Sequence, residues 1–161
     1  MSLSEIRKIG DPILYKKSLE LRRDEVEELL PHFDLMWRLI REFRDVYGRG
    51  RAIAAPQTGL LKRVIAIDTD SRYLLINPKI EYASDEMMEL WDDCMSFPDL
   101  FVKVLRHKHL RISFMNLNWE KEEWDLSDDM AELIQHEYDH LDGILATERA
   151  IDSRSFRWGK P

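Results

Sequence analysis

Two histidines and a glutamate stand at a spacing that is typical of metal-dependent hydrolases. His136, Glu137 and His140 form the pattern H-E-x-x-H. An α-helix turns once in about 3.6 residues, so the two imidazoles would project from one face and could share a metal ion. The carboxylate of Glu137 would then lie where it can exchange protons with a water on the metal. The alternative is a polar helix face with two solvated histidines.

A catalytic metal site takes three protein ligands and keeps one position open, so the third ligand must come from elsewhere in the chain. Cys94 is the leading candidate, because it lies in a segment with loop character, whereas a packing cysteine is more often part of an apolar run. His107 and His109 are rivals, since alternate positions of a strand share a face. They stand among basic residues, which favours a solvated strand. His32 is expected at a helix surface or boundary.

The composition fits one globular domain. The 161 residues are 44% hydrophobic, which is enough for a core. A net charge of −7 argues against a nucleic-acid-binding protein, which would carry a basic excess. The apolar runs are too short to cross a bilayer, and no secretory signal is visible. With Cys94 as the single cysteine no intramolecular disulfide can form, so we expect a cytoplasmic location without membrane contact.

A long helix should precede the segments that carry these residues. Apolar residues spaced three or four apart predict it over residues 24–47, with a capping box at Asp24 and a terminating Gly48. Pro31 indicates either a kink or a short turn before a main helix from about Pro31. Aliphatic runs after Gly48 predict strands, and a hairpin turn is expected at residues 116–120; the predicted strands are 63–68, 73–77, 102–105 and 110–114.

A second helix should carry the H-E-x-x-H pattern. We expect it to begin at an N-cap at Ser127, to run to about Leu141 and to end at Gly143. Residues 144–151 should pair or pack, and residues 152–161 should form a loose, partly basic tail. The order of elements predicts an α+β fold, in which antiparallel or mixed sheets surround the second helix.

Three segments together resemble the peptide deformylase family. Its motifs G-x-G-[LI]-A-A-P-Q, E-G-C-[LM]-S and Q-H-E-x-D-H-L-x-G appear as G-R-A-I-A-A-P-Q at residues 50–57, D-D-C-M-S at residues 92–96 and Q-H-E-Y-D-H-L-D-G at residues 135–143. Order and spacing agree from about Ile6 to Arg149. The resemblance implies a single catalytic domain over residues 1–161, which removes the N-formyl group from the formyl-methionine of newly made proteins and releases formate.

The resemblance also implies a role for each residue of the site. Cys94, His136 and His140 would hold one divalent metal, usually Fe²⁺ in this family, with Zn²⁺, Ni²⁺ or Co²⁺ as substitutes. Glu137 would be the general acid and base. The Gln57 amide and the backbone N–H of Met95 would stabilise negative charge on the formyl oxygen. Other residues would bind substrate or support the site, namely Gly50, Ile53 and Leu133 for the substrate and Asp92 with Arg106 as an ion pair.

The chain departs from the family pattern at three positions. Asp92 replaces a glutamate, Ala52 replaces a glycine, and Asp93 replaces the glycine before the cysteine. Glycine at that last position permits backbone angles and a close approach that a side chain can obstruct. Asp93 could therefore weaken activity or alter the substrate. We favour tolerated variation.

Other functions remain open at this point. One is a related N-formyl hydrolase with a different small substrate, and another is a non-catalytic paralogue that binds peptides or metal. A zinc endopeptidase fits less well, because the cysteine ligand is not that class's pattern. A transient ribosome contact is compatible with the resemblance, although the C-terminal helix by which some bacterial members dock is not evident.

Overall fold

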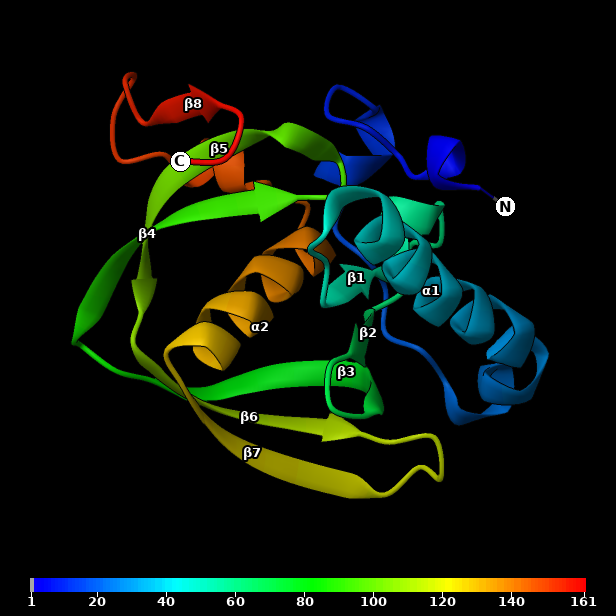
Figure 1. The fold of residues 1–161 in the computed structure, drawn as a ribbon. Coiled ribbons are helices and arrows are strands. Elements are labelled where there is room, and N and C mark those ends of the chain that lie inside the picture. Colours follow the sequence, from blue (N-terminus) through cyan, green and yellow to red (C-terminus); the bar gives the residue numbers. More distant parts are fainter. Residues whose placement is uncertain (1) are drawn as a thin grey trace.

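Two antiparallel sheets and two α-helices form the fold in the computed structural model, which describes residues 2–161 (Figure 1). The larger sheet has the strand order β1-β2-β3-β6-β7 and the smaller one the order β4-β5-β8. The strands of the larger sheet are β1 (Ala52–Ala54), β2 (Val64–Asp68), β3 (Arg72–Ala83), β6 (His109–Met115) and β7 (Lys121–Ser127). Those of the smaller sheet are β4 (Met87–Cys94), β5 (Phe97–His107) and β8 (Phe156–Trp158). The predicted α+β class, with antiparallel sheets and a long N-terminal helix, is confirmed.

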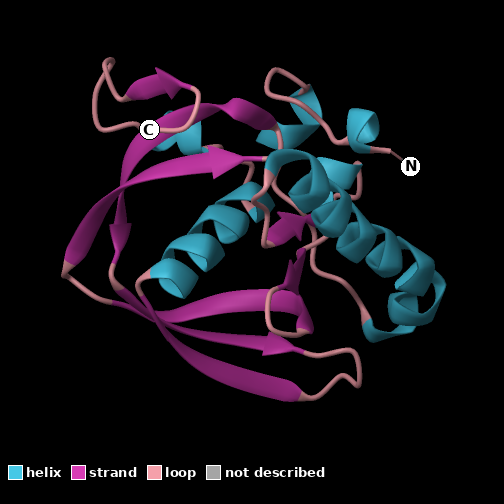
Figure 2. Cartoon of the chain, in the orientation of Figure 1, coloured by secondary structure: helices cyan, strands magenta, loops and turns pink. Residues whose placement is uncertain are grey.

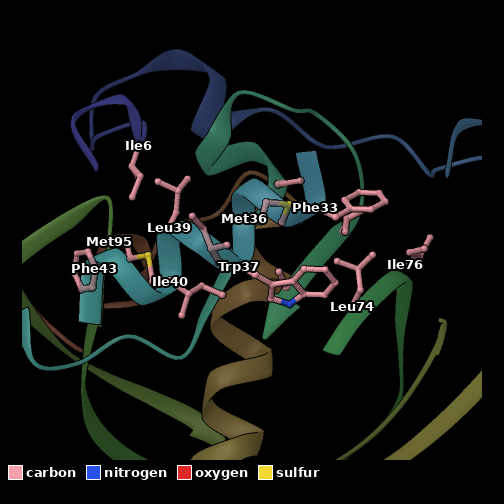
Figure 3. Close-up of a cluster of buried hydrophobic side chains, with 14 of the residues drawn as sticks. Ile6, Phe33, Met36, Trp37, Leu39, Ile40, Phe43, Leu74, Ile76 and Met95 are labelled. Carbon is pink, nitrogen blue, oxygen red and sulfur yellow. The ribbon is translucent and has the colours of Figure 1, made fainter. Parts of the chain in front are cut away.

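The long helix α1 (Val26–Tyr47) packs its apolar stripe onto the larger sheet. Figure 3 shows this cluster, in which the Trp37 indole also donates a hydrogen bond to the carbonyl of Ile67 at 3.1 Å. Gly48 ends the helix with φ +70°, as predicted. The helix begins at Val26 after a short 3-10 turn, so a main helix starting at Pro31 is wrong. The buried residues of the stripe are Phe33, Met36, Trp37, Leu39, Ile40 and Phe43.

The second helix α2 (Asp129–Leu141) lies between the two sheets (Figure 2). Its residues Ala131, Leu133 and Ile134 pack against the larger sheet. The expected N-cap at Ser127 is wrong, because Ser127 is the last residue of β7 and its hydroxyl hydrogen-bonds His109 Nδ1 at 2.8 Å. None of the helices in residues 2–161 is both long and apolar enough to span a membrane.

Two further expectations differ from the structure. Cys94 is the last residue of β4, paired with Phe97, and does not lie in a loop. The segment after Asp152 is no loose tail, since β8 pairs with β5 in antiparallel register. The hairpin turn at residues 116–120 is confirmed by a hydrogen bond from the Asn116 amide to the Glu120 carbonyl at 3.0 Å.

The N-terminal segment, residues 6–21, is hydrogen-bonded to several distant parts of the chain. The Arg7 amide donates to the Gln57 carbonyl at 2.8 Å, and the Ile9 amide donates to the Ser96 carbonyl at 2.9 Å. The Ser18 amide donates to the Leu141 carbonyl at 2.8 Å. Gly143 lies so close to this segment that a Cβ there would be 2.6 Å from the Tyr15 carbonyl. With φ at +74° as well, this position requires glycine.

Candidate metal centre

Three buried side chains converge at the centre of the molecule. Cys94, at the end of β4, meets His136 and His140 from one face of α2, and one ligand atom of each lies within 4.8 Å of the others. Cys94 Sγ is 3.3 Å from His140 Nε2. The other three histidines lie elsewhere: His32 bonds Thr58, His107 bonds the Ser84 carbonyl and His109 bonds Ser127.

The chemistry of this donor set fits a transition metal. A thiolate and two neutral imidazoles are ligands of zinc and iron alike. Burial lowers the pKa of His140 well below its ordinary value, which keeps that imidazole neutral. Burial also acts to lower the pKa of His136, but the charges of Asp92 and Cys94 outweigh it and raise that pKa well above its ordinary value. The negative charges of Asp92 and Cys94 that raise this pKa would also attract a metal cation to the cluster.

Glu137 places a carboxylate beside the cluster. Its Oε1 lies 3.8 Å from His136 Nε2, and its buried Oε2 has no hydrogen-bond partner among the described residues. Burial raises the pKa of Glu137 to about 7. A carboxyl group with such a pKa can take up and release a proton near neutral pH, as a general base and acid must.

A chain of charged side chains holds the ring of His136. Its Nδ1 lies 3.0 Å from the Asp92 carboxylate, which accepts a hydrogen bond from Arg106 at 2.9 Å. Arg106 also donates to Asp139 at 2.6 Å, and Asp139 accepts two hydrogen bonds from Arg149. Burial acts to raise the pKa of Asp92, but the charges of His136 and Arg106 outweigh it and hold that pKa well below its ordinary value. An ionised Asp92 orients the imidazole with Nε2 towards the cluster.

Sequence reasoning paired Asp92 with Arg106 but missed the outer members of this chain. Asp139 stands within the H-E-x-x-H pattern, and its position three residues after His136 on the helix was the available signal. Nothing in the sequence around Arg149 marks it as a partner of Asp139.

Gln57 and Met95 both lie next to the cysteine. The Gln57 side-chain oxygen accepts a hydrogen bond from the Ala54 amide at 3.0 Å, which points its nitrogen at Cys94 Sγ, 3.4 Å away, and at Ser96 Oγ, 3.1 Å away. The Met95 carbonyl accepts from Lys8 Nζ at 3.3 Å, and its side chain lies beside Phe43 in Figure 3. The cluster therefore has an amide donor fixed at its edge.

A cavity of about 190 Å³ opens beside Cys94, His136 and Glu137. Gly50 lines it with φ +131°, and a Cβ there would be 3.0 Å from the Phe43 ring. Ile53 does not line it, because successive residues of β1 face opposite sides and Ile53 is fully buried in the α1 cluster. The other lining residues are Phe43, Arg49, Arg51, Ala52, Asp92, Asp93, Met95, Glu132 and Leu133.

Asp93 lies at an irregularity in the pairing of β4 with β5, between Asp92 and Cys94. Its φ is not positive, so the position does not demand glycine. Its carboxylate accepts a hydrogen bond from Arg49 Nε at 2.8 Å, and Arg49 also donates to the Pro98 carbonyl and lies over the Phe101 ring. The carboxylate is therefore held by Arg49, a residue that sequence reasoning did not single out.

Comparisons with known proteins agree on one family. A family model described as polypeptide deformylase matches residues 3–156. A peptide deformylase of Pseudothermotoga lettingae is 35% identical over 155 residues, which are 96% of this chain and 86% of the relative. One of Natranaerobius thermophilus is 36% identical over 157 residues, covering 93% and 94% of the two chains.

Solved structures of the same kind resemble the fold. The crystal structure of peptide deformylase from Thermotoga maritima superposes with a TM-score of 0.79 at 31% identity, covering 91% of this chain and 97% of the other. An actinonin-bound class I type b peptide deformylase from Acinetobacter baumannii gives a TM-score of 0.81 at 31% identity, covering 90% and 96%.

Proposed function

Because the chain belongs to the peptide deformylase family, we propose that the cluster of Cys94, His136 and His140, with its cavity, is where it carries out deformylation. The reaction hydrolyses the N-formyl group of peptides that begin with formyl-methionine and releases formate. One observation carries the assignment to this site: three buried ligand atoms lie within 4.8 Å of one another, next to the carboxylate of Glu137 and at the wall of a cavity. The helix α2 would then be the metal-bearing centre of the fold.

A divalent metal held by these three residues would supply Lewis-acid chemistry, which acidifies water and polarises a carbonyl. Fe²⁺ is our choice, and Zn²⁺, Ni²⁺ or Co²⁺ fit the same donors. Asp92 would keep His136 in the tautomer that presents Nε2 to the cluster. Arg106 in turn stabilises the Asp92 carboxylate by a hydrogen bond.

Glu137 would move the protons of the reaction. Its carboxylate takes a proton from the attacking water, whose oxygen bonds to the formyl carbon. Negative charge then builds on the formyl oxygen, where the Gln57 side-chain amide and the Met95 backbone N–H donate hydrogen bonds. As the carbon–nitrogen bond breaks, Glu137 gives its proton to the departing amine, and the products are formate and a free N-terminus.

The cavity would receive the methionine side chain. Gly50 lets the backbone pass close to the substrate, and Leu133, three residues before His136 on α2, forms an apolar wall. Ile53 lies on the opposite face of β1, so it would support this wall only indirectly, through the position of its strand. We further propose that residues 1–161 act as one catalytic domain in the cytoplasm, on nascent chains and with transient ribosome contact.

The test is formate release from formyl-Met-Ala-Ser by protein purified anaerobically with ferrous iron. We expect turnover above about 1 s⁻¹, which is within the usual range of enzymes. Glu137→Gln should bind a full equivalent of metal and lose at least about a hundredfold in kcat. Glu123→Gln, an exposed residue of β7, is the matched control and should leave kcat unchanged.

Near-normal turnover by Glu137→Gln would contradict the role of Glu137. Full metal binding without turnover in the wild type would instead favour the related N-formyl hydrolase with another substrate, or the non-catalytic paralogue.

A further inference from the structure

An ion pair forms part of the wall of the cavity. Arg51 Nη2 lies 3.0 Å from Glu132 Oε2, and both residues line the cavity together with Leu133, His136 and Glu137. The Glu132 side chain is 13% exposed and that of Arg51 is 41% exposed. Burial and the charge of Asp92 raise the pKa of Glu132 to about 7, against the opposing effect of Arg51. Two ionisable side chains, paired with each other, stand where a cavity for an apolar side chain would be lined by hydrocarbon.

The fold directs both side chains to this place. Glu132 is one helical turn before His136 on α2, so its carboxylate faces the same side as the metal ligands. Arg51 follows Gly50 and immediately precedes β1. The pair thus joins the first turn of α2 to the start of β1, the two elements that border the cavity.

The rest of the wall is mixed, with charged residues such as Arg49 and Asp93 as well as apolar ones. Phe43, Met95 and Leu133 offer hydrocarbon and thioether surface for the stem of a substrate side chain. A hydrocarbon side chain that reached the ion pair would remove water from both charges without replacing its hydrogen bonds. A side chain with a hydrogen-bonding group at its end would replace that water.

We propose that Arg51 and Glu132 are specificity-determining residues, which make the cavity favour a first side chain with an apolar stem and a polar end over a hydrocarbon of equal length. This inference rests on the proposed function, because it assigns the cavity to the first side chain of the formylated substrate. A thioether is a weak acceptor, so methionine should rank between glutamine and its hydrocarbon analogue norleucine.

The experiment compares kcat and KM for three peptides that differ in the first residue: formyl-Gln-Ala-Ser, formyl-Met-Ala-Ser and formyl-norleucyl-Ala-Ser. In the wild type we expect kcat/KM to fall in that order. In the double variant Arg51→Leu/Glu132→Leu the ratio of norleucine to glutamine should rise about tenfold or more, chiefly through KM. A loss of structure alone would lower all three values and would leave the norleucine-to-glutamine ratio unchanged.

The matched control is Lys62→Leu/Glu25→Leu. That ion pair has a similar length of 2.9 Å and an equally exposed carboxylate, 13%, but lies outside the cavity, so the ratio should stay unchanged. If the leucine variant does not fold, Arg51→Gln/Glu132→Gln removes both charges while keeping polar side chains of similar length, and the discrimination should shrink.

The experiment distinguishes a failure of the proposed function from a failure of this inference alone. No formate from any of the three peptides with metal bound overturns the proposed function, and this inference with it. Formate release with a norleucine-to-glutamine ratio that changes by less than about twofold in the folded variants overturns the inference alone.

Discussion

Replacing Arg106 with methionine should lower the free energy of unfolding by about 3–5 kcal/mol. The Arg106 side chain is 3% exposed and bridges two carboxylates, Asp92 at 2.9 Å and Asp139 at 2.6 Å. Methionine has a similar length but no charge and no donor. Asp139 would keep Arg149, whereas Asp92, 2% exposed, would keep no guanidinium partner. The large effect is expected because the buried Asp92 carboxylate would lose its guanidinium and keep only His136 beside it.

The control is Arg111→Met. Arg111 pairs with Asp125 at the same distance of 2.9 Å, but the two side chains are 54% and 75% exposed. Water screens that pair, so its loss should leave the free energy of unfolding nearly unchanged. Urea unfolding of the metal-free protein, followed by tryptophan fluorescence, measures both variants. A loss below about 1 kcal/mol for Arg106→Met, or equal losses for the two variants, would refute the reasoning.

Two further changes test the surroundings of the cluster. Asp92→Asn should weaken metal binding by about 10–100-fold, because it removes the charge that orients His136. Competition with a chelating dye measures the affinity, and an unchanged affinity would contradict that role of Asp92. Asp93→Gly should change kcat/KM on formyl-Met-Ala-Ser by less than about threefold, since Arg49 holds the Asp93 carboxylate. A rise of about tenfold would instead mean that Asp93 restrains activity.

Local patterns were enough to predict the parts of the fold that local forces determine. The stripe of α1, its end at Gly48 and the hairpin at residues 116–120 depend on periodicity and turn chemistry within a few residues. The strand β8 does not, because Phe156–Trp158 is a strand only through its pairing with β5, far away in the sequence. The N-cap at Ser127 failed for a similar reason, since the partner of its hydroxyl is His109 on another strand.

In the candidate site, too, some features follow from the local sequence and others only from contacts between distant segments. The spacing of His136 and His140 predicts one helix face, and α2 places both imidazoles there. Arg51 carries no local signal, because its partner Glu132 is on another element and only the folded chain brings them together. Ion pairs between distant segments are the features that a single sequence does not reveal.

The N-terminal segment described above has a consequence for folding kinetics. Its amides bond to Gln57, Ser96 and Leu141, at increasing distances along the chain. Closing such long loops loses chain entropy before the contacts are gained, which slows folding. During synthesis the segment emerges before these partners, and the last of them, Leu141, lies beside Gly143. Ser18 can therefore make its bond to Leu141 only after the chain has been translated through α2.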